Sequence, residues 1–163
     1  MTFTEGANYF VIEDQAVPLI KRRQLKAGEL LLLTVPQDSI RCGGWGSLKP
    51  IPARYVLDAT EIGNIQSATS TFNRIMMEKA LEKNLAYVDM NSYMKTLASG
   101  ILFNGVTFTP TFVTGGAFSL DGVHLTPRGY ALAANEMIRT INSKYGCSVP
   151  RIDVNTYGGL KFP

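Results

Sequence analysis

The chain has 163 residues, a length that suits one folded domain. Sixteen Lys and Arg residues against 13 Asp and Glu give a net charge of +3, too small to require nucleic acid or an anionic membrane as a partner. Hydrophobic residues make up 45% and charged residues 18%, which is enough apolar material for a packed core and excludes the disordered class. The sequence has one histidine, His124, which excludes any metal site that needs two histidine ligands.

The first half of the chain predicts one buried strand and then a long loop. Residues 29–35 form a nearly continuous run of leucine and valine, which is typical of a strand buried on both faces of a parallel sheet. Pro36 ends this strand. Residues 36–52 are rich in glycine and proline and contain Trp45, so they predict a loop.

The middle of the chain predicts a long helix and a second strand. Apolar residues recur every three to four positions between 62 and 81, the spacing of an amphipathic helix. Residues 85–89 predict a buried strand and residues 92–98 a short helix. A strand, a helix and a strand in this order normally form a right-handed crossover between parallel strands.

The last third predicts a hairpin and a helix. Apolar residues alternate over 101–114 around the Asn-Gly turn signal at 104–105. Thr126 and Pro127 predict the N-cap and the first residue of a helix, and Gly146 predicts its end. An apolar stripe is expected along this helix, made by Tyr130, Ala134, Met137, Ile138 and Ile141. Residues 148–163 are expected to wrap the surface as a tail.

The segment most informative about chemistry contains Asp121 and His124. An imidazole acts as a general base only in the correct tautomer and orientation, and a carboxylate that accepts a hydrogen bond from Nδ1 provides both. In a tight turn, a spacing of three residues lets the Asp121 carboxylate reach the His124 ring. The pair lies directly before a predicted helix, so we expect it on a loop held by a rigid element.

The run from Asp121 to Glu136, DGVHLTPRGYALAANE, resembles the last conserved block of the SGNH (GDSL) hydrolases, a family of lipases and esterases. In that family, Asp-x-x-His supplies two members of a Ser-His-Asp triad, and a glycine after the histidine packs the next helix closely, as Gly129 would here. The resemblance covers roughly residues 29–145, with specific motif residues only at 119–135. It implies that Asp121 is the orienting carboxylate and His124 the general base.

The predicted fold follows from the elements and from this resemblance. We expect an α/β fold: a single domain over residues 1–163 with a partial three-layer, flavodoxin-like α/β/α arrangement, a small parallel sheet and a hairpin. The chain is expected to be the C-terminal part of a longer SGNH hydrolase. One edge of the sheet would then be uncovered, so we expect a homo-oligomer through that edge.

The nucleophile that the family requires is not clearly present. The nearest counterpart of Gly-Asp-Ser-Leu is Gln-Asp-Ser-Ile, which contains Ser39 and follows the leucine-rich strand. The glycine and asparagine that complete the family's oxyanion hole have no intact counterpart after it. Two explanations stay open: the nucleophile lies in a missing N-terminal half, which we favour, or Ser39 is a divergent nucleophile of a complete enzyme. Ser47, in a glycine-rich loop, is a weaker candidate, and Ser119 is interpreted as a turn-forming hydroxyl.

The predicted function is ester hydrolysis of a small-molecule substrate through an acyl-enzyme, without cofactor or metal. The alternative is a non-catalytic remnant or interaction module that lacks its own nucleophile. Four phenylalanines upstream of the pair are interpreted as hairpin core rather than an acyl pocket: Phe103, Phe108, Phe112 and Phe118. Arg128 is interpreted as an exposed arginine at a helix start rather than a substrate contact.

Compartment and redox state are not readable from the chain. No signal peptide and no apolar run long enough for a membrane span is visible, although a longer parent protein would be compatible with secretion or a periplasmic location. Cys42 and Cys147 form no metal-binding pattern. They are interpreted as two buried thiols, with a disulfide as the alternative.

Overall fold

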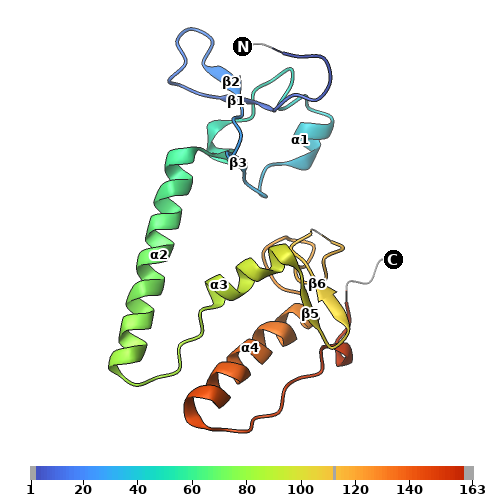
Figure 1. Cartoon of the computed structure of the whole chain (residues 1–163). Coiled ribbons are helices and arrows are strands. Elements are labelled where there is room, and N and C mark those ends of the chain that lie inside the picture. The colour runs from blue at the N-terminus through green and yellow to red at the C-terminus, as the bar shows by residue number, and fades with distance from the viewer. Residues whose placement is uncertain (1–2, 112, 160–163) are drawn as a thin grey trace. The chain divides into compact units, whose positions relative to one another are not determined.

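A computed structural model describes residues 3–111 and 113–159 (Figure 1). The chain divides into two compact units, Met1–Thr69 and Ser70–Pro163, with the boundary inside the long helix α2, Ala59–Glu82. Each unit is described by itself below. The prediction of a single domain that belongs to a longer hydrolase stays a prediction.

The first unit is built from two short antiparallel strand pairs. Strand β1, Val11–Glu13, pairs with β2, Arg22–Gln24, and β3, Leu30–Leu31, pairs with β4, Val56–Leu57. A five-residue helix, α1, covers Gln37–Arg41, and a 3₁₀ turn, η1, covers Ala53–Tyr55. The core of this unit consists of five buried side chains: Ile12, Leu25, Val35, Ile51 and Val56.

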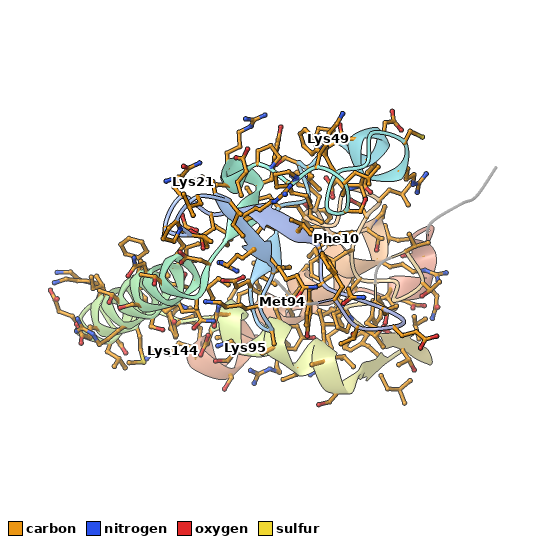
Figure 2. The ribbon with its side chains drawn as sticks, turned by 90° about the horizontal axis from the view of Figure 1, so that it is seen from above. Phe10, Lys21, Lys49, Met94, Lys95 and Lys144 are labelled. Atoms are coloured by element: carbon orange, nitrogen blue, oxygen red, sulfur yellow. The ribbon has the colours of Figure 1, made fainter. Side chains whose placement is uncertain are left out.

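Close backbone packing in this unit depends on Gly46. Its carbonyl accepts a hydrogen bond from Val11 N at 2.7 Å, and its φ of 84° lies in the left-handed region that favours glycine. A Cβ at this position would collide with the ring of Phe10, which is labelled in Figure 2. The predicted loop therefore holds one helix and is packed against β1 at this point.

The prediction of a flavodoxin-like fold with a parallel sheet is wrong. Every sheet in the described residues is a two-stranded antiparallel pair. The leucine-rich run forms only two residues of strand and then turns, and Leu30 and Leu33 are 53% and 67% exposed. Residues 85–89 have no regular secondary structure and belong to no strand pair. An apolar run shows that its side chains gain free energy when they are buried, but it does not specify which other segment of the chain packs against them.

The helix predictions are confirmed. Helix α2 begins with a capping box, in which Glu61 N donates to Asp58 Oδ1 at 2.8 Å and Asp58 N donates to Glu61 Oε2 at 3.0 Å. Helix α3, Met90–Lys95, and the 3₁₀ turn η2, Thr96–Ser99, occupy the predicted short helix. No helix in the described ranges is long and apolar enough to cross a membrane.

The second unit packs a hairpin against a long helix. Strands β5, Ile101–Phe103, and β6, Val106–Phe108, form the predicted antiparallel hairpin. Its two turn residues have positive φ, as a two-residue hairpin turn of Asn and Gly requires. Helix α4, Pro127–Tyr145, has the predicted start and ends at Gly146 in the left-handed conformation. The core consists of Leu97, Phe108, Ala117, Ala131, Leu132 and Val154.

The C-terminal segment lies mostly on the surface, as predicted for residues 148–163, but it adds one side chain to this core. Residues 160–163 of the predicted tail lie outside the described residues. Val154, in the 3₁₀ turn η3 (Val154–Thr156), is fully buried. Three side chains spaced seven residues apart on α4 hold the backbone of the segment: Asn142 binds both N and O of Val149, Asn135 binds both N and O of Ile152, and Arg128 Nε donates to the Tyr157 carbonyl. Two turns of helix are about seven residues, so the three side chains share one face.

Replacing Asn135 by alanine is expected to lower the free energy of unfolding of the second unit by about 1–3 kcal/mol. Asn135 is 3% exposed, and its amide binds the N and O of the partly buried Ile152 at 2.7 and 2.8 Å. The substitution would leave both backbone groups without this partner. The matched control is Asn142→Ala, which removes the same pair of bonds at a site that water can reach. Denaturation followed by circular dichroism measures both variants. Equal losses in the two would contradict this account.

Candidate functional site

Asp121 and His124 lie on a tight hairpin loop that leads into α4. Ser119 N donates to the His124 carbonyl at 2.8 Å, and Thr126 N donates to the Ala117 carbonyl at 2.9 Å. An antiparallel bridge between Phe118 and Leu125 lies between these two bonds. We call residues 117–126 the dyad hairpin.

The structure brings the Asp121 carboxylate and the His124 ring together. His124 Nδ1 lies 2.6 Å from Asp121 Oδ2. The other carboxylate oxygen, Oδ1, accepts three bonds: from Ser119 Oγ at 2.6 Å, from Val123 N at 2.9 Å and from His124 N at 2.9 Å. The carboxylate is therefore held by its own loop on one oxygen and leaves the other oxygen to the imidazole.

These donors favour the ionised carboxylate. The hydroxyl of Ser119, the His124 ring and the two backbone N–H groups hold the pKa of Asp121 well below its usual range. An ionised carboxylate only accepts hydrogen bonds, so the bond to His124 requires a proton on Nδ1. In the neutral ring, Nε2 then carries the lone pair. This is the tautomer that can take a proton from a hydroxyl.

The base of the dyad hairpin is held against α4 by two small residues. Thr126 is 1% exposed, and its Oγ1 donates to the Gly116 carbonyl at 2.7 Å and accepts from Gly129 N at 3.0 Å. Gly129 is buried against the Ala117 carbonyl, and a Cβ there would collide with that oxygen. The expected close packing of the helix at Gly129 is therefore confirmed.

The dyad is open to solvent at its reactive side. The side chains of His124 and Asp121 are 70% and 50% exposed. Within the described residues of the second unit, the His124 ring forms its hydrogen bond through Nδ1, and no hydroxyl binds Nε2. The position that a nucleophile would occupy is thus accessible.

The candidate serines lie in different places. Ser39 is in α1 of the first unit, where its backbone N donates to the Pro36 carbonyl at 3.1 Å. Ser47, also in the first unit, donates its hydroxyl to the Gly44 carbonyl at 3.2 Å. Ser119 forms the predicted turn through its backbone, and its hydroxyl holds Asp121. Sequence reasoning missed this second contact, although the spacing Ser-x-Asp in a turn is visible in the sequence.

The other candidate residues have structural contacts. Phe103, Phe108 and Phe118 belong to or pack against the hairpin core, as interpreted from the sequence, and Phe112 lies outside the described residues. Arg128 is half-buried and holds the C-terminal segment, so its interpretation as an exposed arginine is wrong. Cys42 and Cys147 are free and exposed, so the interpretation as buried thiols is also wrong.

The described residues contain no group of three or more His, Cys, Asp or Glu side chains that could hold a metal ion. A scan against protein-family models and searches of curated proteins and of solved structures found no match to this chain. The chemical interpretation of the site therefore rests on its geometry and on the sequence block that contains it.

Proposed function

We propose that Asp121 and His124 form the acid–base half of a Ser-His-Asp site that hydrolyses a small-molecule ester. The observation that carries this proposal is the short Nδ1–Oδ2 contact of 2.6 Å, made by a carboxylate whose other oxygen is occupied by three donors. This arrangement presents an unprotonated Nε2 to the outside, as a general base requires. The resemblance of the surrounding block to the SGNH hydrolases supports the assignment of an ester as substrate.

The proposed reaction proceeds in two steps. A serine oxygen attacks the ester carbonyl carbon while His124 Nε2 takes the hydroxyl proton, and the tetrahedral intermediate then expels the alcohol, which receives that proton. Water attacks the resulting acyl-serine with the same proton transfers and releases the carboxylic acid. Asp121 stabilises the imidazolium that forms in both steps.

We propose that the nucleophile is a serine other than Ser39. The short helix α1 uses the backbone N of Ser39 and of Ile40 in bonds to the Pro36 carbonyl, at 3.1 and 3.4 Å. The N–H of a nucleophilic serine normally helps to bind the oxyanion, so a residue whose N–H is committed to its own helix is a poor nucleophile. Ser119 is also excluded, because its hydroxyl holds Asp121.

The proposal is tested by two measurements on the same protein. Because the chain has one histidine, imidazole signals in a ¹⁵N spectrum arise from His124 alone. We expect the Nδ1–H tautomer at neutral pH in the wild type and a shift of the tautomer population in Asp121→Asn, whose amide can donate as well as accept. A tautomer population that is the same in both proteins would overturn the proposed dyad.

The second measurement is labelling with a serine-directed fluorophosphonate. We expect no label at Ser39. A label that is lost in Ser39→Ala and in His124→Ala would overturn the assignment of the nucleophile to another serine and would favour Ser39. Ser67→Ala is the matched control, because it removes the hydroxyl of an exposed serine in helix α2 of the same unit.

A further inference from the structure

The loop that joins β1 to β2 in the first unit has an apolar tip. It covers residues 14–21, and Figure 1 shows it projecting beyond the ends of the two strands. Leu19 is 97% exposed, the largest exposed fraction among the large hydrophobic side chains of the described residues, and Ile20 is 49% exposed. Pro18 is exposed beside them. We call residues 17–20 the apolar tip.

Leu19 adopts a backbone conformation that is unfavourable for leucine. Its φ of 65° lies in the left-handed region, where the Cβ of a leucine crowds the backbone and where glycine or asparagine is favoured. Because the side chain is almost fully exposed, packing inside the unit does not offset this strain. A strained residue without a packing gain is typical of a functional site.

Hydrogen bonds within the loop hold the apolar tip in place. Asp14 N donates to the Lys21 carbonyl at 3.0 Å, and Lys21 N donates to the Val17 carbonyl at 3.2 Å. The Asp14 carboxylate accepts from Ala16 N at 2.9 Å and from Arg23 Nε at 2.6 Å. The tip is therefore presented on an ordered loop, and a partner that binds it does not have to order the chain first.

Basic side chains lie directly behind the apolar tip. Residues 13–26 contain four basic and two acidic residues. Arg23 is bound in ion pairs, whereas Lys21, Arg22 and Lys26 are exposed and form no ion pair within the described residues. Lys21 is labelled in Figure 2. An apolar tip with exposed cations behind it is complementary to a lipid surface, where anionic headgroups cover the acyl chains.

The carboxylates of this region lie at the base of the loop. Glu13, Asp14, Asp58 and Glu61 contribute to the lining of a hollow of about 280 Å³, to which none of the residues 17–22 contributes. Two of these carboxylates form the capping box of α2, and Asp14 is bound to Arg23. The negative charge is therefore separated from the apolar tip and from the two basic residues that follow it.

We propose that the loop between β1 and β2 docks the chain on an anionic lipid surface. Leu19 and its apolar neighbours enter the boundary between headgroups and acyl chains, and Lys21, Arg22 and Lys26 bind the headgroups. A lipid fits this loop better than a protein does, because a stable protein interface buries about 800 Å² on each partner and a tip of four residues is too small for that. The proposal concerns the first unit and does not depend on the Asp121–His124 dyad.

Cosedimentation of the whole chain with lipid vesicles tests the proposal. We expect the wild type to bind vesicles of equimolar phosphatidylcholine and phosphatidylglycerol, with less binding as the salt concentration rises and little binding to phosphatidylcholine alone. Leu19→Asn is expected to weaken binding about tenfold or more, because it removes a leucine side chain from the lipid. Leu48→Asn is the matched control: Leu48 is 84% exposed, in a loop that is bonded to the Val11 end of β1.

The stability of Leu19→Asn separates lost docking from lost folding. Asparagine tolerates the left-handed conformation better than leucine, so the midpoint of unfolding followed by Trp45 fluorescence is expected to stay or to rise in this variant. A wild type that does not bind the mixed vesicles, or a Leu19→Asn variant that binds them as tightly, would overturn the proposal. Equal binding to both kinds of vesicle would overturn the role of the basic residues. Self-association that depends on Leu19, without vesicle binding, would assign the tip to a protein contact instead.

Discussion

Replacing Phe108 by alanine is expected to destabilise the second unit by about 3–5 kcal/mol. Phe108 is fully buried in β6, at the centre of the core that joins the hairpin to α4. Removal of a buried aromatic ring loses the transfer free energy of its carbon atoms and leaves a cavity that the surrounding backbone fills only in part. The loss is measured by chemical denaturation followed by circular dichroism.

The same substitution is expected to loosen the dyad hairpin. The Phe108 ring lies next to Gly116, and the Gly116 carbonyl accepts a hydrogen bond from Thr126 Oγ1. Ala117, the first residue of the dyad hairpin, belongs to the same core as Phe108. We therefore expect faster hydrogen exchange at the backbone amides of Gly122 and Thr126, which are bonded inside this hairpin. Leu102→Ala is the control, since it truncates a 72% exposed side chain of the same β-hairpin. Equal losses of stability in both variants would contradict the argument.

Replacing Arg23 by alanine is expected to cost the first unit about 3–5 kcal/mol. Arg23 binds Glu29 through both terminal nitrogens, at 2.6 and 2.7 Å, and Asp14 through Nε at 2.6 Å. The Glu29 side chain is only 4% exposed, so removal of the guanidinium leaves a buried carboxylate without its cation. Trp45, the single tryptophan, packs against the core of this unit, so its fluorescence reports unfolding of this unit.

The matched control for this prediction is Arg22→Ala, because Arg22 is the neighbouring exposed arginine of β2. The double variant Arg23→Met, Glu29→Leu is expected to recover much of the loss, since it removes both charges together. A double variant as unstable as Arg23→Ala would show that packing of the arginine, and not the unpaired charge, carries the effect.

The pH dependence of this ion pair has a defined sign. The hydrogen bonds from Arg23 are the largest cause that lowers the pKa of Glu29 below its ordinary value of 4.5. Because the pKa of Glu29 is lower in the folded than in the unfolded chain, its ionised carboxylate stabilises the fold at pH values above the unfolded-state pKa. This contribution is complete above about pH 5 and is lost as the pH falls through the pKa of Glu29 in the folded state. Trp45 fluorescence should therefore show a steeper loss of stability below pH 4.5 in the wild type than in Arg23→Ala.

The Asp121–His124 contact and the pairing of the strands show which features of this protein the sequence predicts and which it does not. The contact of Asp121 with His124 depends on three residues of a turn, and a capped helix follows directly, so the local spacing was sufficient to predict it. The Ser-x-Asp spacing is compatible with the hydrogen bond from the Ser119 hydroxyl to Asp121, but the side-chain rotamer adopted in the turn decides whether this bond forms. The pairing of the strand predicted over residues 29–35 was wrong, because an apolar run is compatible with several partners. Only Leu30 and Leu31 pair, and Leu31 pairs with Val56, 25 residues further along the chain.

By itself, the sequence determined the elements whose interactions are local: the helix over residues 62–81, the Asn-Gly turn of the hairpin, the Thr-Pro start and glycine end of α4, and the proximity of Asp121 to His124. These depend on groups a few positions apart, whose geometry the backbone restricts strongly. Only the tertiary structure decided which strands pair, that the C-terminal segment adds Val154 to the core, and that α4 turns its small residues inward and its apolar stripe outward. The physical reason is that an apolar side chain gains from burial against any surface, so its partner is selected by the packing of distant segments and not by its own position in the chain.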